Sequence, residues 1–131
     1  MKQPIVLLIE DNPQNRYLTT FLLEQHGYQV LSAPDGRLGI EAAKNRLPDL
    51  ILLDIQLPLM DGYAVARALR EIPPLGDTPI IAVTSYAMVG DREKCLAAGC
   101  NGYIEKPINP ETFVTEIGKY LKSPAPDQGT P

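Results

Sequence analysis

Charged side chains stand at the ends of short apolar runs in this sequence. They are Glu10, Asp11, Asp54 and Lys106. The run before Asp54, residues 50–53, is apolar throughout, which is typical of a strand buried on both faces of a sheet. An ionised carboxylate at the end of such a strand is unfavourable unless something neutralises or uses it. Carboxylates bind Mg²⁺ and are also nucleophiles toward phosphorus, so these residues indicate a metal site suited to phosphoryl transfer.

The carboxylates need cations if they lie together. Two of them about 4 Å apart repel each other by roughly 4 kcal/mol at an effective dielectric near 20. Neighbouring side chains of an extended segment point to opposite sides, so one of Glu105 and Lys106 faces the acids, and charge favours Lys106. The same rule applies to Thr84 and Ser85, and the residues alone do not decide between these two. Mg²⁺, Lys106 and Thr84 would together neutralise and orient phosphoryl oxygens.

The strands that would position these residues are short and alternate with amphipathic stretches. The apolar runs are residues 5–9, 28–32, 50–53, 80–83 and 103–104. This alternation predicts an α/β fold, with a parallel sheet covered by helices on both faces. In an open parallel sheet, ligands bind outside the carboxyl ends of the strands, where the winding direction reverses. The charged residues and hydroxyls named above all follow predicted strand ends.

Helices are expected in the segments between the strands. They run from Pro13 to a stop at Gly27, from about Asp35 to Arg46, from Gly62 to Arg70, from Asp91 to Ala98, and onward from Pro110. Three of them have a capping side chain before the first residue, from Asn12, Asp61 and Asn109. Gly39 weakens the second helix. One face of the first helix carries Tyr17, Leu18, Phe21 and Leu22.

Composition limits the classes of protein to consider. The 131 residues, 44% of them apolar, are enough for one domain with a core. We assign this domain to residues 1–122, and 123–131, with three prolines, to a disordered tail or the start of a linker. The net charge of −4 and pI of about 4.9 argue against direct binding to nucleic acid.

Neither a membrane span nor a disulfide framework is expected. No apolar run approaches the roughly 18 residues of a span, and the first residues do not read as a signal peptide, so the cytoplasm is the expected compartment. The two cysteines, Cys95 and Cys100, lack the partners of a zinc site. We expect both to be reduced, half-buried packing residues.

Four segments together resemble a receiver domain of the response regulators of two-component signalling, over residues 4–122. They are IEDN at 9–12, DLILLDIQLPLMDG at 49–62, IIAVTSYA at 80–87 and GYIEKPI at 102–108. The resemblance, which is to single-domain regulators of the chemotaxis type, implies a flavodoxin-like (βα)5 fold with a doubly wound, five-stranded sheet in the order 2-1-3-4-5. It also implies a cis bond at Lys106-Pro107, which X-Pro bonds permit.

The resemblance implies a phosphoacceptor and a metal. Asp54 would receive a phosphoryl group from a phosphohistidine of a sensor histidine kinase or of a histidine phosphotransfer protein. Asp11, Asp54 and the backbone carbonyl of Gln56 would bind Mg²⁺, with Glu10 acting through a water. The protein would then be a signalling switch that catalyses only its own phosphorylation and dephosphorylation, and is not otherwise an enzyme.

Further residues receive roles from the same resemblance. Thr84 and Lys106 would bind the phosphoryl oxygens, and Tyr103 would turn inward when Thr84 moves, although an aromatic in an edge strand is also common as core. Gln56 and Tyr86 would control how water reaches the phosphoryl group, and bulky Tyr86 would lengthen its lifetime. The surface of the last two helices and the strand between them would control a downstream partner that the sequence does not identify.

Two other activities compete with the switch. Phosphatases of the haloacid dehalogenase type also begin with an aspartate nucleophile, but their second acid falls at the position of Gln56, and the chain lacks room for their cap domain. A flavin-binding protein of this fold would need a hydroxyl- and glycine-rich phosphate loop where this sequence has the acidic EDNPQN at 10–15.

The switch could also be a free-standing regulator or a receiver module of a longer kinase or effector. Met1, only a few residues before the first predicted strand, favours a free-standing protein or an N-terminal receiver.

Overall fold

Five parallel strands form one sheet in the order β2-β1-β3-β4-β5, as the resemblance implied. The computed structural model describes residues 3–85 and 89–121, so the predicted tail at 123–131 and Tyr86 lie outside the described residues. The strands are β1 (Ile5–Ile9), β2 (Gln29–Ala33), β3 (Leu50–Asp54), β4 (Ile80–Thr84) and β5 (Gly102–Glu105). All five predicted strands are confirmed, and their pairing adds Asp54 to β3 and Thr84 to β4.

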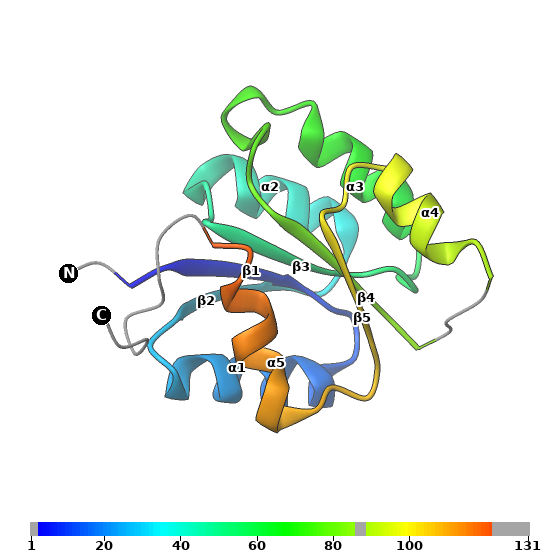
Figure 1. Ribbon diagram of the computed structural model, residues 1–131. Helices are drawn as coiled ribbons and strands as arrows, with labels where there is room; N and C mark the ends of the chain where they lie inside the picture. The colour runs from blue at the N-terminus through cyan, green and yellow to red at the C-terminus, as the bar shows by residue number, and fades with distance from the viewer. Residues whose placement is uncertain (1–2, 86–88, 122–131) are drawn as a thin grey trace.

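Helices cover both faces of the sheet, with α1 and α5 on one face and α2, α3 and α4 on the other (Figure 1). Their bounds are α1 (Pro13–Gln25), α2 (Gly36–Arg46), α3 (Gly62–Arg70), α4 (Asp91–Ala97) and α5 (Pro110–Gly118), with a short 3-10 helix η1 (Pro73–Leu75) before β4. The predicted caps are confirmed, because Asn12, Asp61 and Asn109 each accept a backbone N–H of the first turn. None of the described helices is long and apolar enough to span a lipid bilayer.

Alternate residues of the central strands build two separate cores. Leu7 and Leu53 point to the layer of α2, α3 and α4, whereas Leu8 and Leu52 point to the layer of α1 and α5. These strand residues are almost completely buried, as expected for strands covered on both faces. The polar residues therefore lie at the carboxyl ends of strands that are packed against helices on both faces.

The apolar face predicted on α1 is largely exposed. Tyr17, Leu18 and Phe21 are 69%, 61% and 54% exposed, respectively. The helix instead buries Thr19 and Leu23, which are four residues apart and turn the same side toward the sheet. The orientation of α1 on the sheet therefore covers the side that carries Thr19 and Leu23 and leaves the predicted apolar face largely exposed.

Gly39 has a packing role that offsets its low helix propensity. A Cβ built on Gly39 would lie 2.5 Å from Cδ1 of Ile9, closer than two carbon atoms can approach. Because Ile9 is the last residue of β1, the glycine lets α2 pack tightly beside the strand that leads into Glu10.

Leu59, in the loop between β3 and α3, has a backbone conformation that side chains disfavour. Its φ is +68°, and its side chain is 97% exposed, so no burial compensates for the conformation. An L-residue in the left-handed region costs roughly 1–2 kcal/mol, and glycine does not carry this penalty. We expect Leu59→Gly to raise the free energy of unfolding by about 1 kcal/mol, after the extra entropy of glycine in the unfolded chain is subtracted.

Urea denaturation of the purified protein measures this change. Leu59→Ala is the matched control, because it removes the exposed side chain but keeps Cβ and hence the strain. An equal stabilisation by Leu59→Ala and Leu59→Gly would show that the backbone conformation is not the cause.

Candidate functional site

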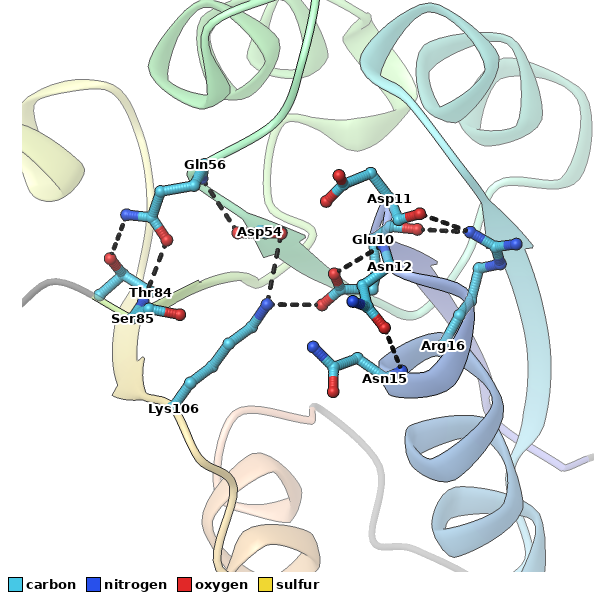
Figure 2. A network of polar contacts seen from close by, with 10 residues as sticks. All are labelled: Glu10, Asp11, Asn12, Asn15, Arg16, Asp54, Gln56, Thr84, Ser85 and Lys106. Carbon is cyan, nitrogen blue, oxygen red and sulfur yellow. Dashed lines mark hydrogen bonds and ion pairs between the residues drawn. The ribbon is translucent and has the colours of Figure 1, made fainter.

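The register of the sheet brings the predicted site residues to one edge. Ile9 pairs with Leu53, so Glu10 follows β1 beside Asp54 at the end of β3. Asp54 pairs with Val83, and Thr84 pairs with Glu105, so Thr84 at the end of β4 and Lys106 directly after β5 lie along the same edge. Figure 2 shows the resulting network of polar contacts.

Three carboxylates gather at this edge, as predicted. One carboxylate oxygen from each of Glu10, Asp11 and Asp54 lies within 4.8 Å of the other two. Glu10 and Asp54 are 4% exposed, whereas Asp11 is exposed. Repulsion among these groups is strong in a partly desolvated site, so the arrangement requires cations.

Lys106 supplies one of these cations. Its Nζ lies 2.8 Å from Oε1 of Glu10 and 3.3 Å from Oδ2 of Asp54, while Glu105 is exposed. The prediction that Lys106 rather than Glu105 faces the acids is therefore confirmed. Burial acts to lower the pKa of Lys106, but the hydrogen bond to Glu10 and the charge of Asp54 outweigh it and raise the pKa above its ordinary value. The ammonium is thus charged at neutral pH.

The contact with Lys106 does not fully compensate the negative charge of Asp54. Burial, followed by the charge of Glu10, raises the pKa of Asp54 from 3.8 to about 6, against the opposing effects of Lys106 and of the Gln56 backbone N–H. That N–H donates to Oδ1 of Asp54 at 2.9 Å, and Lys106 approaches Oδ2. Both oxygens therefore have a donor, yet a further cation would stabilise the ionised form.

The donor set fits Mg²⁺. Three carboxylates within reach of one ion are hard oxygen ligands, and together with one ammonium they leave negative charge for a divalent cation to balance. Magnesium binds through one or two carboxylates and keeps several waters, which suits a site with one exposed ligand, Asp11.

The hydroxyl of Thr84, rather than that of Ser85, belongs to this network. Thr84 is 2% exposed and its hydroxyl accepts a hydrogen bond from Nε2 of Gln56, whereas Ser85 is exposed. The Ser85 backbone N–H donates to Oε1 of Gln56 at 3.0 Å. The sequence had left the choice between the two hydroxyls open, and it gave no sign that the Gln56 side chain would reach the end of β4.

Sequence reasoning also missed Arg16, one turn into α1. Its Nη1 donates to the backbone carbonyl of Glu10 at 2.8 Å and more weakly to that of Asp11 at 3.4 Å. The Asn12 backbone N–H donates to the Glu10 carboxylate at 3.1 Å. These contacts fix the turn that carries two of the acids, and the only signal in the sequence was a cation placed shortly after them.

The remaining predicted residues lie outside this network. Tyr103 is partly buried and packs against the core of α2, α3 and α4, so its inward turn stays a prediction.

Cys95 and Cys100 are free and fully buried rather than half-buried. Burial raises the pKa of both thiols, that of Cys100 to about 12, which keeps them protonated. The bond between Lys106 and Pro107 is cis, as the resemblance implied.

Comparison with known protein families identifies the family of this chain. The family model described as the response regulator receiver domain matches residues 6–118. The chain belongs to the response-regulator receiver family. The receiver is 40% identical over 116 residues to the polar-differentiation response regulators DivK of Brucella anthropi and Brucella ovis, an alignment that covers 88% of this chain and 94% of each relative.

Solved structures of receivers have the same fold. The chemotaxis protein CheY4 of Vibrio cholerae is 29% identical, with a TM-score of 0.88 over 92% of this receiver and 100% of that chain. The receiver domain of a sensor histidine kinase of Pseudomonas aeruginosa is 36% identical, with a TM-score of 0.85 over 93% of this receiver and 100% of that chain. That domain was crystallised with a magnesium ion coordinated in its active-site cleft.

Proposed function

We propose that this receiver is a phosphorylation-activated switch in which Asp54 accepts a phosphoryl group from a phosphohistidine of a sensor histidine kinase or histidine phosphotransfer protein. The observation that carries the proposal is a buried carboxylate at a strand end, held by the Gln56 N–H on one oxygen and by Lys106 on the other, beside Glu10 and Asp11. A carboxylate held in this way is oriented for attack on phosphorus.

In the transfer, an oxygen of Asp54 forms a bond to phosphorus as the P–N bond to the donor imidazole breaks. The bonding electron pair returns to the imidazole nitrogen, which leaves as neutral imidazole after protonation. Lys106 and the Thr84 hydroxyl would donate to the transferring oxygens. Mg²⁺ held by Asp11, Asp54 and the Gln56 backbone carbonyl, with Glu10 acting through a water, would supply further positive charge at these oxygens.

The phosphoryl group adds about −1.5 to −2 charge at this edge of the sheet. We propose that Thr84 moves toward it, that Tyr103 turns inward, and that the surface of α4, β5 and α5 changes for an unidentified protein partner. The cytoplasm is the proposed compartment, and neither nucleic acid nor a membrane is a proposed direct partner. Catalysis would be limited to the receiver's own phosphorylation and dephosphorylation, with Gln56 and Tyr86 controlling the access of water.

A receiver module of a longer kinase or effector is the second candidate. One of the similar solved structures is the receiver domain of a sensor histidine kinase, whereas DivK is a response regulator. Both arrangements would use the same acceptor site, so the chemistry proposed for Asp54 does not depend on this choice.

The intact mass of the protein tests the acceptor. Incubation with Mg²⁺ and acetyl phosphate is expected to add about 80 Da, the mass of one phosphoryl group, and EDTA is expected to prevent the gain. Asp54→Asn, which keeps the size of the side chain, is expected to gain nothing. Glu41→Gln, at an exposed carboxylate of α2, is the control and should gain as much as the wild type.

Two results would contradict the proposal. One is an equal gain of mass in Asp54→Asn and the wild type. The other is a wild type that takes up no phosphoryl group from acetyl phosphate or from any member of a panel of phosphorylated histidine kinases and phosphotransfer proteins.

A further inference from the structure

The Gln56 side chain connects the loop after β3 to the end of β4. Its Nε2 donates to Oγ1 of Thr84, and its Oε1 accepts the backbone N–H of Ser85 at 3.0 Å, as Figure 2 shows. We call this pair of hydrogen bonds the Gln56 bridge. The backbone N–H of the same residue donates to Oδ1 of Asp54, so Gln56 contacts both the acceptor and the end of the neighbouring strand.

The bridge holds two polar groups at the end of β4 that would donate to a phosphoryl group on Asp54. Phosphoryl oxygens are stabilised by preorganised donors at the place where their charge lies. At the end of β4 the Ser85 N–H is such a donor, and in this structure it donates to the Gln56 amide oxygen. The Thr84 hydroxyl is a second one, and its oxygen is held by the hydrogen bond that it accepts from the Gln56 amide nitrogen. A phosphoryl group and the Gln56 side chain therefore compete for the Ser85 N–H, and the bond from Gln56 restrains the Thr84 hydroxyl at its present position.

We propose that Gln56 is a positioning residue that holds Thr84 and the Ser85 N–H in the unphosphorylated arrangement and must release both when Asp54 is phosphorylated. This inference rests on the proposed function and adds to it a residue that biases the switch toward its resting state. A ligand shifts such an equilibrium only through its different affinities for the two states, and the bridge is present in only one of them. Loss of the bridge should therefore favour the phosphorylated arrangement.

The resting contact can be tested without any phosphoryl group. We expect the Ser85 amide hydrogen to exchange with solvent about tenfold faster in Gln56→Met than in the wild type, because Met has nearly the same length but no amide. Gln14→Met, at an exposed glutamine of α1, is the matched control and should leave the exchange unchanged. Equal exchange rates in Gln56→Met and the wild type would overturn the bridge.

The competition is tested with beryllofluoride, a mimic of the phosphoryl group, in the presence of Mg²⁺. We expect Gln56→Met to bind it about tenfold more tightly than the wild type, since the hydrogen bond that competes for the Ser85 N–H and the one that restrains Thr84 are both removed. Gln56→Asn keeps the amide but is one methylene shorter, so it should also bind more tightly, and it serves if Met disturbs folding.

The outcomes separate this inference from the function on which it rests. If the wild type binds beryllofluoride and both variants bind it equally or more weakly, the competition is wrong and the proposed function stands. If the wild type binds none and its mass does not increase with any donor, the proposed function fails, and the competition fails with it.

Discussion

Lys106→Met is expected to lower the free energy of unfolding by about 3 kcal/mol at pH 8 in the absence of Mg²⁺. The ammonium lies between Glu10 and Asp54, and the three side chains are only 14%, 5% and 4% exposed, respectively. Removal of one partner of a buried ion pair leaves a desolvated charge without compensation, which is much less favourable than loss of a surface pair. Here two carboxylates lose their common cation and also repel each other.

The loss of stability in Lys106→Met should depend on pH, and the titration of Asp54 determines whether it grows or shrinks as the pH rises. The pKa of this carboxyl in the folded protein is already raised to about 6, and the charge of Lys106 acts to lower it, so Lys106→Met raises it further. A carboxyl whose pKa is raised by folding destabilises the folded state when ionised. This destabilisation is absent when the pH is below the pKa of the carboxyl in the unfolded chain, near 4, and is complete when the pH is above its pKa in the folded protein. We therefore expect a smaller deficit at pH 5 than at pH 8.

Urea unfolding in EDTA at the two pH values measures this effect. Lys44→Met, at an exposed lysine of α2, is the matched control and should change stability by less than about 0.5 kcal/mol at either pH. Addition of Mg²⁺ should restore more stability to Lys106→Met than to the wild type, because the ion replaces the missing charge. A deficit that is the same at both pH values would contradict the assignment of the effect to Asp54.

Arg70→Ala is expected to reduce the free energy of unfolding by about 3–4 kcal/mol, through contacts at the opposite ends of β4 and β5 from the acids. The Arg70 guanidinium donates to the side-chain oxygen Oδ1 of Asn101. It also donates to four backbone carbonyls, those of Leu75, Gly76, Thr78 and Gly99. Asn101 in turn accepts the backbone N–H of Ile80 at 2.9 Å. The variant would leave several partly buried acceptors without a donor.

Thermal or urea unfolding of three variants isolates this effect. Arg67→Ala, on an exposed position of the same helix, should be nearly neutral. Arg70→Lys keeps the charge but lacks the planar group that reaches several acceptors at once, so it should recover only a minority of the loss. If Arg70→Lys were as stable as the wild type, charge rather than the hydrogen-bond geometry would explain the role of Arg70.

The fold class and the ends of the strands could be predicted from the sequence because they depend on local patterns. The apolar runs marked the strands, and the Asn12, Asp61 and Asn109 caps marked helix starts through contacts spanning two or three residues. Charge alone predicted that Lys106 rather than Glu105 would face the acids, because only a cation could lie there. The strand order and the proposed role of Asp54 as phosphoacceptor came from the receiver resemblance.

Tertiary structure alone decided which distant side chains meet. Gln56 reaches Thr84 across 28 positions of the sequence, and Arg70 reaches Asn101 across 31. Such contacts depend on strand register and on side-chain rotamers, which composition and periodicity do not encode. The same holds for Tyr17 on α1, whose apolar side is left exposed because the angle between helix and sheet, set by the whole core, turns Leu23 inward.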